Sequence, residues 1–226
     1  MKSHVLSATQ VFRGTLFIVL LSAFPFTTLA QLSERVTEIC EVVHPIGWVK
    51  FKEGINIAGD RVFVDHADNF GLGENDEMRL IRQWTDDLGF THYRYQQYHA
   101  GVPIEYAMFT IVTRNGRSVS GNGRIAAFFS PYPRVAVTKQ QALQTAVASL
   151  PYGTPSWLDH HNEELSRSVL NVSEFTSYPE SQLMFVRRDV EAGYSGENLV
   201  LAYKIPISTI RPAAHFEVCI GARSEE

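Results

Sequence analysis

Apolar-rich runs of strand length, separated by turns, fill the middle of the chain. Strand-length runs of this kind cover residues 78–85, 90–98, 104–113 and 118–125. Turns that contain glycine join them, and the last turn is Asn115-Gly116, the strongest short-range signal for a hairpin. The pattern therefore predicts an antiparallel meander over this part of the chain.

The spacing of apolar residues changes to that of a helix after Ser130-Pro-Tyr-Pro133, where proline cannot continue a strand ladder. Thr138 with Gln141 three residues later forms a capping box, and alanine and leucine then recur at helical spacing until Pro151. Shorter helices are predicted within residues 61–70 and 157–166, and strands at 182–188, 199–207 and 216–220.

These elements predict an α+β fold made of two small subdomains, each an antiparallel sheet with a helix. We expect the first over residues 31–129, a linker at 130–135 and the second over 136–226. The length of 226 residues suits one large domain or two small ones. With 45% hydrophobic and 12% aromatic residues, the chain can bury a core, which excludes general disorder.

The first thirty residues have the pattern of a signal peptide. Lys2 and Arg13 are their only charges, Leu16–Phe24 is an apolar run, and small residues at Thr28 and Ala30 precede Gln31. The alternative is a membrane anchor, but the apolar run is far shorter than the roughly 20 residues that span a bilayer. We expect cleavage after residue 30, a secreted or periplasmic protein, and no membrane association after cleavage.

The charge balance argues against a nucleic-acid partner. The formal net charge is −4, and it becomes −6 once Lys2 and Arg13 are removed. Binding to phosphate backbones needs a clear surplus of lysine and arginine.

Two cysteines, Cys40 and Cys219, lie in strand-like runs near the ends of the mature chain. Export would permit a disulfide between them, worth up to roughly 5 kcal/mol because it closes nearly the whole domain. The alternative is two free thiols, and the sequence leaves both open.

The sequence contains no recognisable catalytic signature. No histidine is followed by glutamate, so the His-Glu-x-x-His motif of zinc peptidases is absent, and there is no Gly-x-Ser-x-Gly. His160 and Glu164 would share a helix face and could hold a metal, but a solvated polar face is the stronger interpretation without a third ligand. Cys219 and His215 would lie about 13 Å apart along a strand, too far for a catalytic pair. We expect no enzyme activity, no metal and no cofactor.

The run from His92 to Gln97 is unusually polar for a strand. Alternation places His92, Arg94 and Gln96 on one face and Tyr93, Tyr95 and Gln97 on the other, so bulky hydrogen-bonding groups lie on both faces. One interpretation is a sheet with a solvated second face. The other is a sheet face that docks on a protein, where arginine and tyrosine are typical anchors.

At this strand the sequence resembles the fungalysin/thermolysin propeptide (FTP) domain. The motifs that carry the resemblance are Asp87–Gln97 (DLGFTHYRYQQ), Gly101–Ile104 (GVPI) and Asn115–Gly123 (NGRSVSGNG), within a stretch of about residues 48–128. The following unit is similar to a PepSY domain, which has a cystatin-like shape. That likeness rests on the helix at 142–148 and the strands near 199–204 and 216–220.

The resemblance implies the proregion of a secreted zinc peptidase, which assists folding of the catalytic domain and inhibits it until cleavage. It implies docking or fold-motif roles, and no catalytic role, for eight residues: Asp87, Gly89, His92, Arg94, Gln97, Gly101, Pro103 and Asn122. One departure is the ending Val218–Glu226 (VCIGARSEE), which replaces the usual Val-Asp-Ala-x-Thr-Gly pattern and puts in doubt the processing site and the segment that covers the cleft.

Three functions are compatible with these observations. The first is a secreted, non-catalytic module that chaperones or inhibits a thermolysin-like peptidase encoded elsewhere. The second is the N-terminal proregion of a longer metallopeptidase whose catalytic domain is missing here. The third is an exported binding module of cystatin-like shape with a partner unrelated to peptidases.

Overall fold

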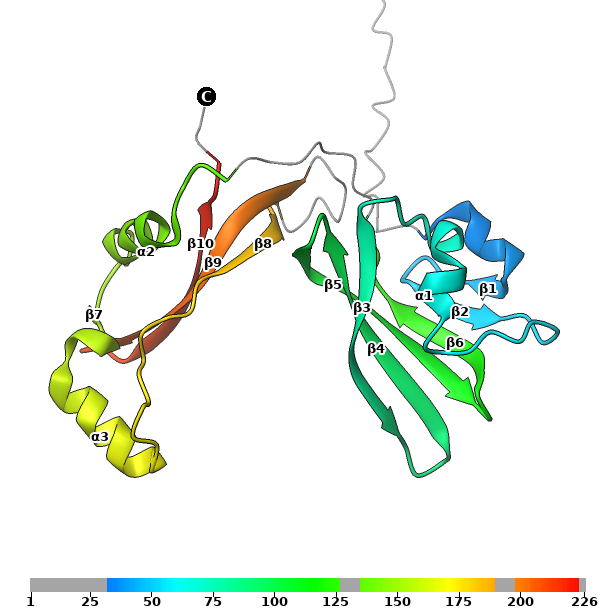
Figure 1. The fold of residues 1–226 in the computed structure, drawn as a ribbon. Coiled ribbons are helices and arrows are strands. Elements are labelled where there is room, and N and C mark those ends of the chain that lie inside the picture. Colours follow the sequence, from blue (N-terminus) through cyan, green and yellow to red (C-terminus); the bar gives the residue numbers. More distant parts are fainter. Residues whose placement is uncertain (1–31, 127–134, 190–197, 224–226) are drawn as a thin grey trace, which may run out of the picture.

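A computed structural model describes residues 32–126, 135–189 and 198–223. Within these ranges, ten strands hydrogen bond into one sheet with the order β1-β2-β6-β5-β8-β9-β10. Strand β4 pairs with β5 on one side and with β3 on the other, and β7 pairs with β9. The chain forms an arch with helices on its outer flanks and strands around the space between its two arms (Figure 1). The fold is mixed and rich in strands, as the α+β prediction requires, whereas its division into subdomains stays a prediction.

The first arm contains the predicted meander. The Asn115-Gly116 turn connects its last two strands with both residues at positive φ, 51° and 77°. These dihedral angles suit the tight hairpin that the dipeptide predicts. The elements of this arm are η1 (Glu34–Glu38), β1 (Cys40–Val43), β2 (Trp48–Phe51), α1 (Val62–Asp65), η2 (Ala67–Phe70), β3 (Asp76–Thr85), β4 (Phe90–His99), β5 (Val102–Arg114) and β6 (Arg117–Gly123).

An aromatic cluster forms the core of this arm. The ring of Phe63 lies 4.9 Å from the rings of both Phe70 and Tyr95, and 5.8 Å from that of Phe109. The Tyr95 hydroxyl, whose burial would otherwise be costly, donates to the carbonyl oxygen of Gly59 at 2.6 Å. These contacts attach α1 and η2 to one face of the meander.

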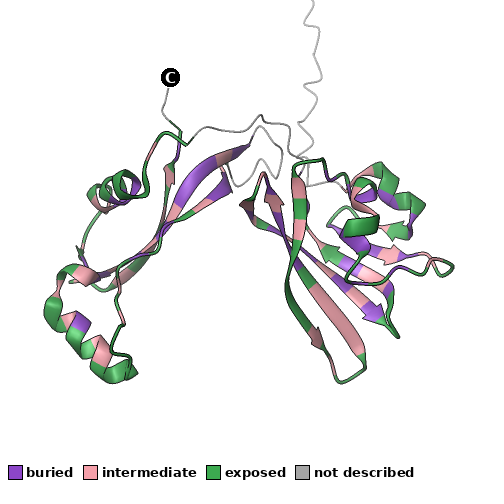
Figure 2. Cartoon of the chain, in the orientation of Figure 1, coloured by how far each residue is buried: buried purple, intermediate pink, exposed green. Residues whose placement is uncertain are grey.

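The second arm is a smaller antiparallel sheet covered by one helix. The Thr138 capping box is confirmed: the backbone N–H of Gln141 donates to the Thr138 hydroxyl at 3.2 Å, and the Gln141 side chain accepts from the Thr138 backbone at 2.9 Å. The helix buries Ala142, Leu143 and Ala146 against β9, which is buried over much of its length (Figure 2). The elements are α2 (Lys139–Ala148), β7 (Thr154–Pro155), η3 (Ser156–Leu158), α3 (His160–Leu170), β8 (Gln182–Arg187), β9 (Leu199–Ile210) and β10 (Ala214–Gly221).

Strand β5 belongs to both cores. Phe109 and Ile111 lie in the aromatic cluster, whereas Ile104 and Ala107 lie in the second cluster with the α2 residues. Between them the strand bends at Tyr106, whose φ is 57°. The two cores are therefore connected through the ordered strand as well as through the chain that follows β6.

The two cysteines lie at opposite ends of the strand order. Cys40 is buried in β1, Cys219 is exposed in β10, and both are free thiols. Of the two alternatives that the sequence left open, the structure has the free thiols, because the strands that carry them are separated by the rest of the sheet.

Two predictions fall outside the described residues. The signal peptide at 1–30 lies wholly outside them, and so does most of the linker at 130–135. Among the residues that are described, no helix has both the length and the hydropathy to cross a bilayer.

Candidate functional site

The candidate site is the face of the sheet opposite the helices, which we call the helix-free face. Cross-strand pairing places His92 opposite Trp84 and Val112, and Arg94 opposite Arg82 and Thr110. The neighbouring residues Tyr93 and Tyr95 point to the aromatic core instead. The alternation predicted for this strand is therefore confirmed at these positions.

Trp84 and His92 form a stacked pair on this face. Their ring centroids are 4.8 Å apart and their planes differ by 4°. Nε2 of His92 contacts Oδ2 of Asp86 at 2.9 Å, and Oδ1 of Asp86 accepts from the backbone N–H groups of Leu88 and Phe90, both at 3.0 Å. The hairpin turn thus fixes the carboxylate, the carboxylate fixes the imidazole, and the imidazole supports the indole.

These hydrogen bonds also affect the carboxyl group. The contact with His92, followed by the N–H donation from Phe90 and Leu88, lowers the pKa of Asp86 below its ordinary value. The ionised carboxylate is therefore the form that the turn favours.

Arg82 and Arg94 are directly opposite each other on β3 and β4, and both are exposed. The guanidinium of Arg82 lies over the Trp84 ring at 5.0 Å, and Nη2 of Arg94 approaches Sδ of Met108 at 3.2 Å. Farther along β3, Arg79 has both an ion pair with Glu77 at 2.8 Å and a stacking contact with Tyr98 at 4.0 Å. The face therefore alternates aromatic rings and arginines.

On the second arm the helix-free face has a charged centre. Nζ of Lys204 in β9 contacts Glu105 of β5 at 2.8 Å and Glu217 of β10 at 3.0 Å. Burial alone would lower the pKa of Lys204, but the hydrogen bonds to Glu105 and Glu217 raise it. This network joins the two arms on the side away from the cores.

Gln96 and Gln97 are buried and act within the fold. Nε2 of Gln96 donates to the carbonyl oxygens of Ile104 at 2.6 Å and Ala107 at 3.1 Å, which braces the bend of β5. Gln97 is fully buried and exchanges two hydrogen bonds with the Ala126 backbone. Gln97 therefore does not lie on the surface that its motif would offer to a partner.

The other residues taken from the motif have turn or surface positions. Gly89 and Gly101 have φ of 79° and 78°, which glycine adopts without strain. Pro103 lies opposite Tyr98, and Asn122 is exposed on β6 opposite Thr110. Asp87 is exposed in the β3–β4 turn, where the neighbouring Asp86 makes the capping contacts.

Sequence reasoning missed Asp86, Arg82 and Trp84. A bulge between Leu80 and Arg82 shifts the alternation of side chains along β3. Strict alternation from the start of the strand therefore does not predict the face on which Arg82 and Trp84 lie. The aspartate six residues before a histidine was the only available signal for Asp86.

The described part of the chain assembles no metal centre. No group of three or more histidine, cysteine, aspartate or glutamate side chains could hold an ion there. His160 and Glu164 are both exposed on α3, in keeping with a solvated polar face. Burial raises the pKa of the Cys40 thiol to about 12, and burial followed by the charge of Glu105 raises that of Cys219, so neither is an activated nucleophile.

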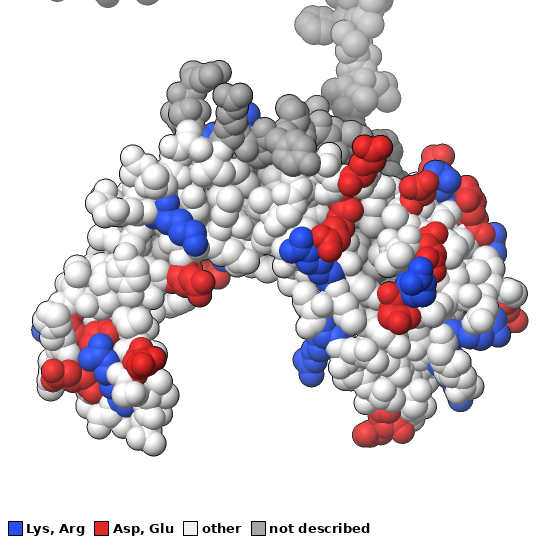
Figure 3. Space-filling view, in the orientation of Figure 1, with Lys and Arg blue, Asp and Glu red and all other residues white. Residues whose placement is uncertain are grey.

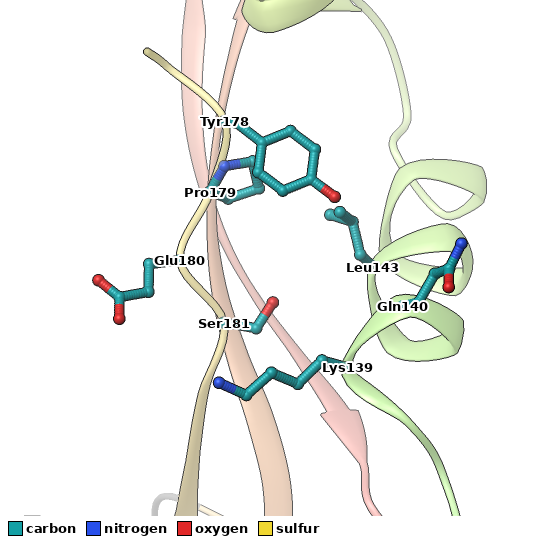
Figure 4. A pocket seen from close by; sticks show the side chains of 7 residues that line it. All are labelled: Lys139, Gln140, Leu143, Tyr178, Pro179, Glu180 and Ser181. Carbon is teal, nitrogen blue, oxygen red and sulfur yellow. The ribbon is translucent and has the colours of Figure 1, made fainter. Parts of the chain in front are cut away.

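A groove on the second arm has a lining of mixed polar and apolar side chains. It has a volume of about 510 Å³ and lies between the start of α2 and residues 178–181. Figure 4 shows Tyr178 facing Leu143 across it, while the carboxylate of Glu180 points away. The polar groups do not converge on one point, so the groove gives no indication of a ligand.

Residues 76–125 match a family described as Fungalysin/Thermolysin Propeptide Motif. This stretch carries the FTP motif. The match begins at the first residue of β3 and ends just after β6, so the strands that form the arginine-rich part of the helix-free face lie within it. The matched propeptide motif is not a catalytic one.

The thermostable neutral protease NprT of Geobacillus stearothermophilus is similar to part of this chain. The two are 30% identical over 89 residues, which is 38% of this chain and 16% of the protease. The chain thus spans only a small part of that relative. The similarity supports a relationship to the proregion of metallopeptidases, whereas the likeness of the second arm to a PepSY domain stays a prediction.

Proposed function

We propose that the chain is a secreted, non-catalytic, proregion-like module that binds the catalytic domain of a thermolysin-like zinc metallopeptidase. In this role it acts as a folding chaperone, an inhibitor or both. The observation that carries the proposal is the coincidence of the FTP motif with β3–β6, the strands that present Arg82, Trp84, His92 and Arg94.

The chemistry of the helix-free face supports a docking role. Interface anchors are enriched in arginine, tryptophan and tyrosine, and this face carries all three as mutually stacked pairs. A hydrogen-bonded sheet is rigid before the partner arrives, which lowers the ordering cost of association. In the space-filling view, Lys and Arg side chains lie along the inner edge of the arm that carries β3 and β4 (Figure 3).

The second arm would extend the same module. We infer a PepSY-like role for it from the packing of α2 on β9 and β10, and from the continuity of the sheet through β5 and β8. The Glu105–Lys204 ion pair holds β9 against β5 and would keep both arms in one orientation toward the partner.

The proposal covers a peptidase partner encoded elsewhere (in trans) and one in the same longer chain (in cis), and the second arrangement has its own support. The similar protein NprT is a protease, and the match covers 16% of it, as expected for a proregion within a longer chain. Secretion or export to a periplasm fits both arrangements. An exported module with a partner unrelated to peptidases is the remaining alternative.

The test uses the mature chain, residues 31–226, and the mature catalytic domain of NprT. We expect a saturable complex in calorimetry, slower hydrolysis of a peptide substrate, and a higher yield when the denatured catalytic domain refolds in the presence of the chain. A serine peptidase of similar size is the control and should be unaffected. Absence of binding together with unchanged hydrolysis and refolding would refute the proposal.

A further inference from the structure

The cross-strand pair Arg82 and Arg94 places two like charges in direct opposition. Like charges opposite each other on a sheet are destabilising. Among the described residues, no carboxylate lies within ion-pair distance of either guanidinium, although Arg79 on the same strand has Glu77. The free protein thus keeps an unfavourable arrangement on an exposed surface.

Both guanidinium groups are held by soft, uncharged neighbours. Arg82 lies over the indole of Trp84 at 5.0 Å, and Arg94 lies against the sulfur of Met108 at 3.2 Å. A guanidinium that rests on a ring keeps its in-plane N–H groups available for a planar acceptor such as a carboxylate. A third arginine, Arg114, lies over Phe90 at 5.2 Å on the same face and has no carboxylate partner in the described residues.

The support beneath Arg82 is built from the turn upward. Asp86 is fixed by two backbone N–H groups and holds His92, and His92 stacks under Trp84. The orientation of the indole therefore does not depend on a ligand. Such preorganisation reduces the side-chain entropy lost on binding.

We propose that Arg82 and Arg94 form a clamp for a carboxylate on an acidic surface of a protein partner. The identity of that partner, the peptidase catalytic domain, rests on the proposed function. The choice of a carboxylate as the bound group rests on charge complementarity with the two guanidinium groups. A carboxylate between the two guanidinium groups would neutralise the repulsion that the free protein bears. The overall charge of −4 disfavours a nucleic-acid occupant.

The first experiment tests the chemistry without any peptidase. The mature chain, labelled with ¹⁵N, is titrated with a hexaglutamate peptide while the arginine Nε–H signals are followed by NMR. We expect saturable shifts for Arg82 and Arg94 and none for Arg188, an exposed arginine after β8. No shift at Arg82 and Arg94 would overturn the inference, and so would tighter binding at these signals by a single-stranded oligonucleotide.

The second experiment tests the partner. Binding to the NprT catalytic domain is measured for the wild type, Arg82→Gln, Arg94→Gln and the control Arg188→Gln. We expect each clamp variant to weaken the Kd by about 10-fold or more, as for loss of a charge-assisted hydrogen bond, with the control unchanged. If the wild type binds the catalytic domain and the Kd of both clamp variants is unchanged, the clamp would be overturned and the proposed function would stand. If the wild type does not bind the catalytic domain although hexaglutamate still shifts the signals of Arg82 and Arg94, only the proposed function would be refuted.

Discussion

Gln97 and Ala126 exchange two hydrogen bonds: Nε2 of Gln97 donates to the Ala126 carbonyl at 2.8 Å, and the Ala126 N–H donates to Oε1 of Gln97 at 2.7 Å. The side chain is fully buried, and Ala126 lies in the second core. A side chain of the FTP motif therefore attaches the end of the first arm to the core of the second.

Gln97→Ala should destabilise the mature chain by about 3 kcal/mol, because it leaves a buried N–H and a buried carbonyl of Ala126 without partners. Urea unfolding followed by circular dichroism gives the free energy. The matched control is Gln83→Ala, an exposed glutamine on β3, which should change it by less than about 0.5 kcal/mol. Equal effects of the two substitutions would contradict the assigned role of Gln97.

Arg94→Gln should stabilise the free protein by about 0.2–1 kcal/mol, because it removes the repulsion with Arg82 across the strands. The gain should shrink as salt is added, since exposed charges are screened. The control Arg79→Gln removes an ion pair with Glu77 and should bring no gain. Thermal unfolding at low and high ionic strength measures both, and a destabilised Arg94→Gln would count against the repulsive pair.

Asp86→Asn should have a pH-dependent effect. The pKa of Asp86 is lowered in the folded state by His92 and the turn N–H groups, so its contribution is present above the unfolded pKa of about 3.9 and is lost as pH falls through the folded value. The difference in unfolding free energy between the wild type and Asp86→Asn should therefore be largest near neutral pH and should shrink below about pH 4. Urea titrations from pH 7 to pH 3 test this, with the exposed Asp87→Asn as control. A pH-independent difference would argue against the capping role.

The two thiols should differ in reactivity. Burial raises the pKa of the Cys40 thiol to about 12, whereas Cys219 is an exposed residue of β10. At pH 8 a disulfide reagent such as DTNB should titrate Cys219 in the native protein and Cys40 only after denaturation. If denatured, unreduced protein gave no free thiol, Cys40 and Cys219 would be bridged after all.

Lys204→Met should destabilise the contact between the arms, because it leaves the half-buried Glu105 without its cation. We expect a loss of about 1–3 kcal/mol and faster amide exchange in β8 and β9, measured by mass spectrometry. Lys139→Met, on an exposed residue of α2, is the control. Unchanged exchange in β8 and β9 would show that Ile104 and its neighbours suffice for the junction.

Local patterns predicted much of this fold because each rests on residues close in sequence. The Asn115-Gly116 turn, the Thr138–Gln141 capping box and the alternation of His92 to Tyr95 are all decided within a few residues. The short strand β2 pairs with β6, far along the chain, and β1 joins the sheet only through β2, so sequence periodicity gave little sign of this pairing.

The site was less predictable for the same reason. Membership of the helix-free face depends on the bulge before Arg82, which no composition signal marks. The sequence also did not distinguish Asp86 from Asp87, since only the folded turn decides which carboxylate meets the Leu88 and Phe90 N–H groups. The motif left open whether Gln97 has a docking or a structural role, and only its two hydrogen bonds with the Ala126 backbone show why it is buried.

Because β5 contributes to both cores, the limits of the recognisable motif are not the limits of a folding unit. A fragment cut after residue 125 would end just short of Ala126 and would expose Ile104 and Ala107, which the second arm now covers. The two arms should accordingly lose their structure in one cooperative transition. Recombination between related sequences at this point would build the second core from two sequences that do not match.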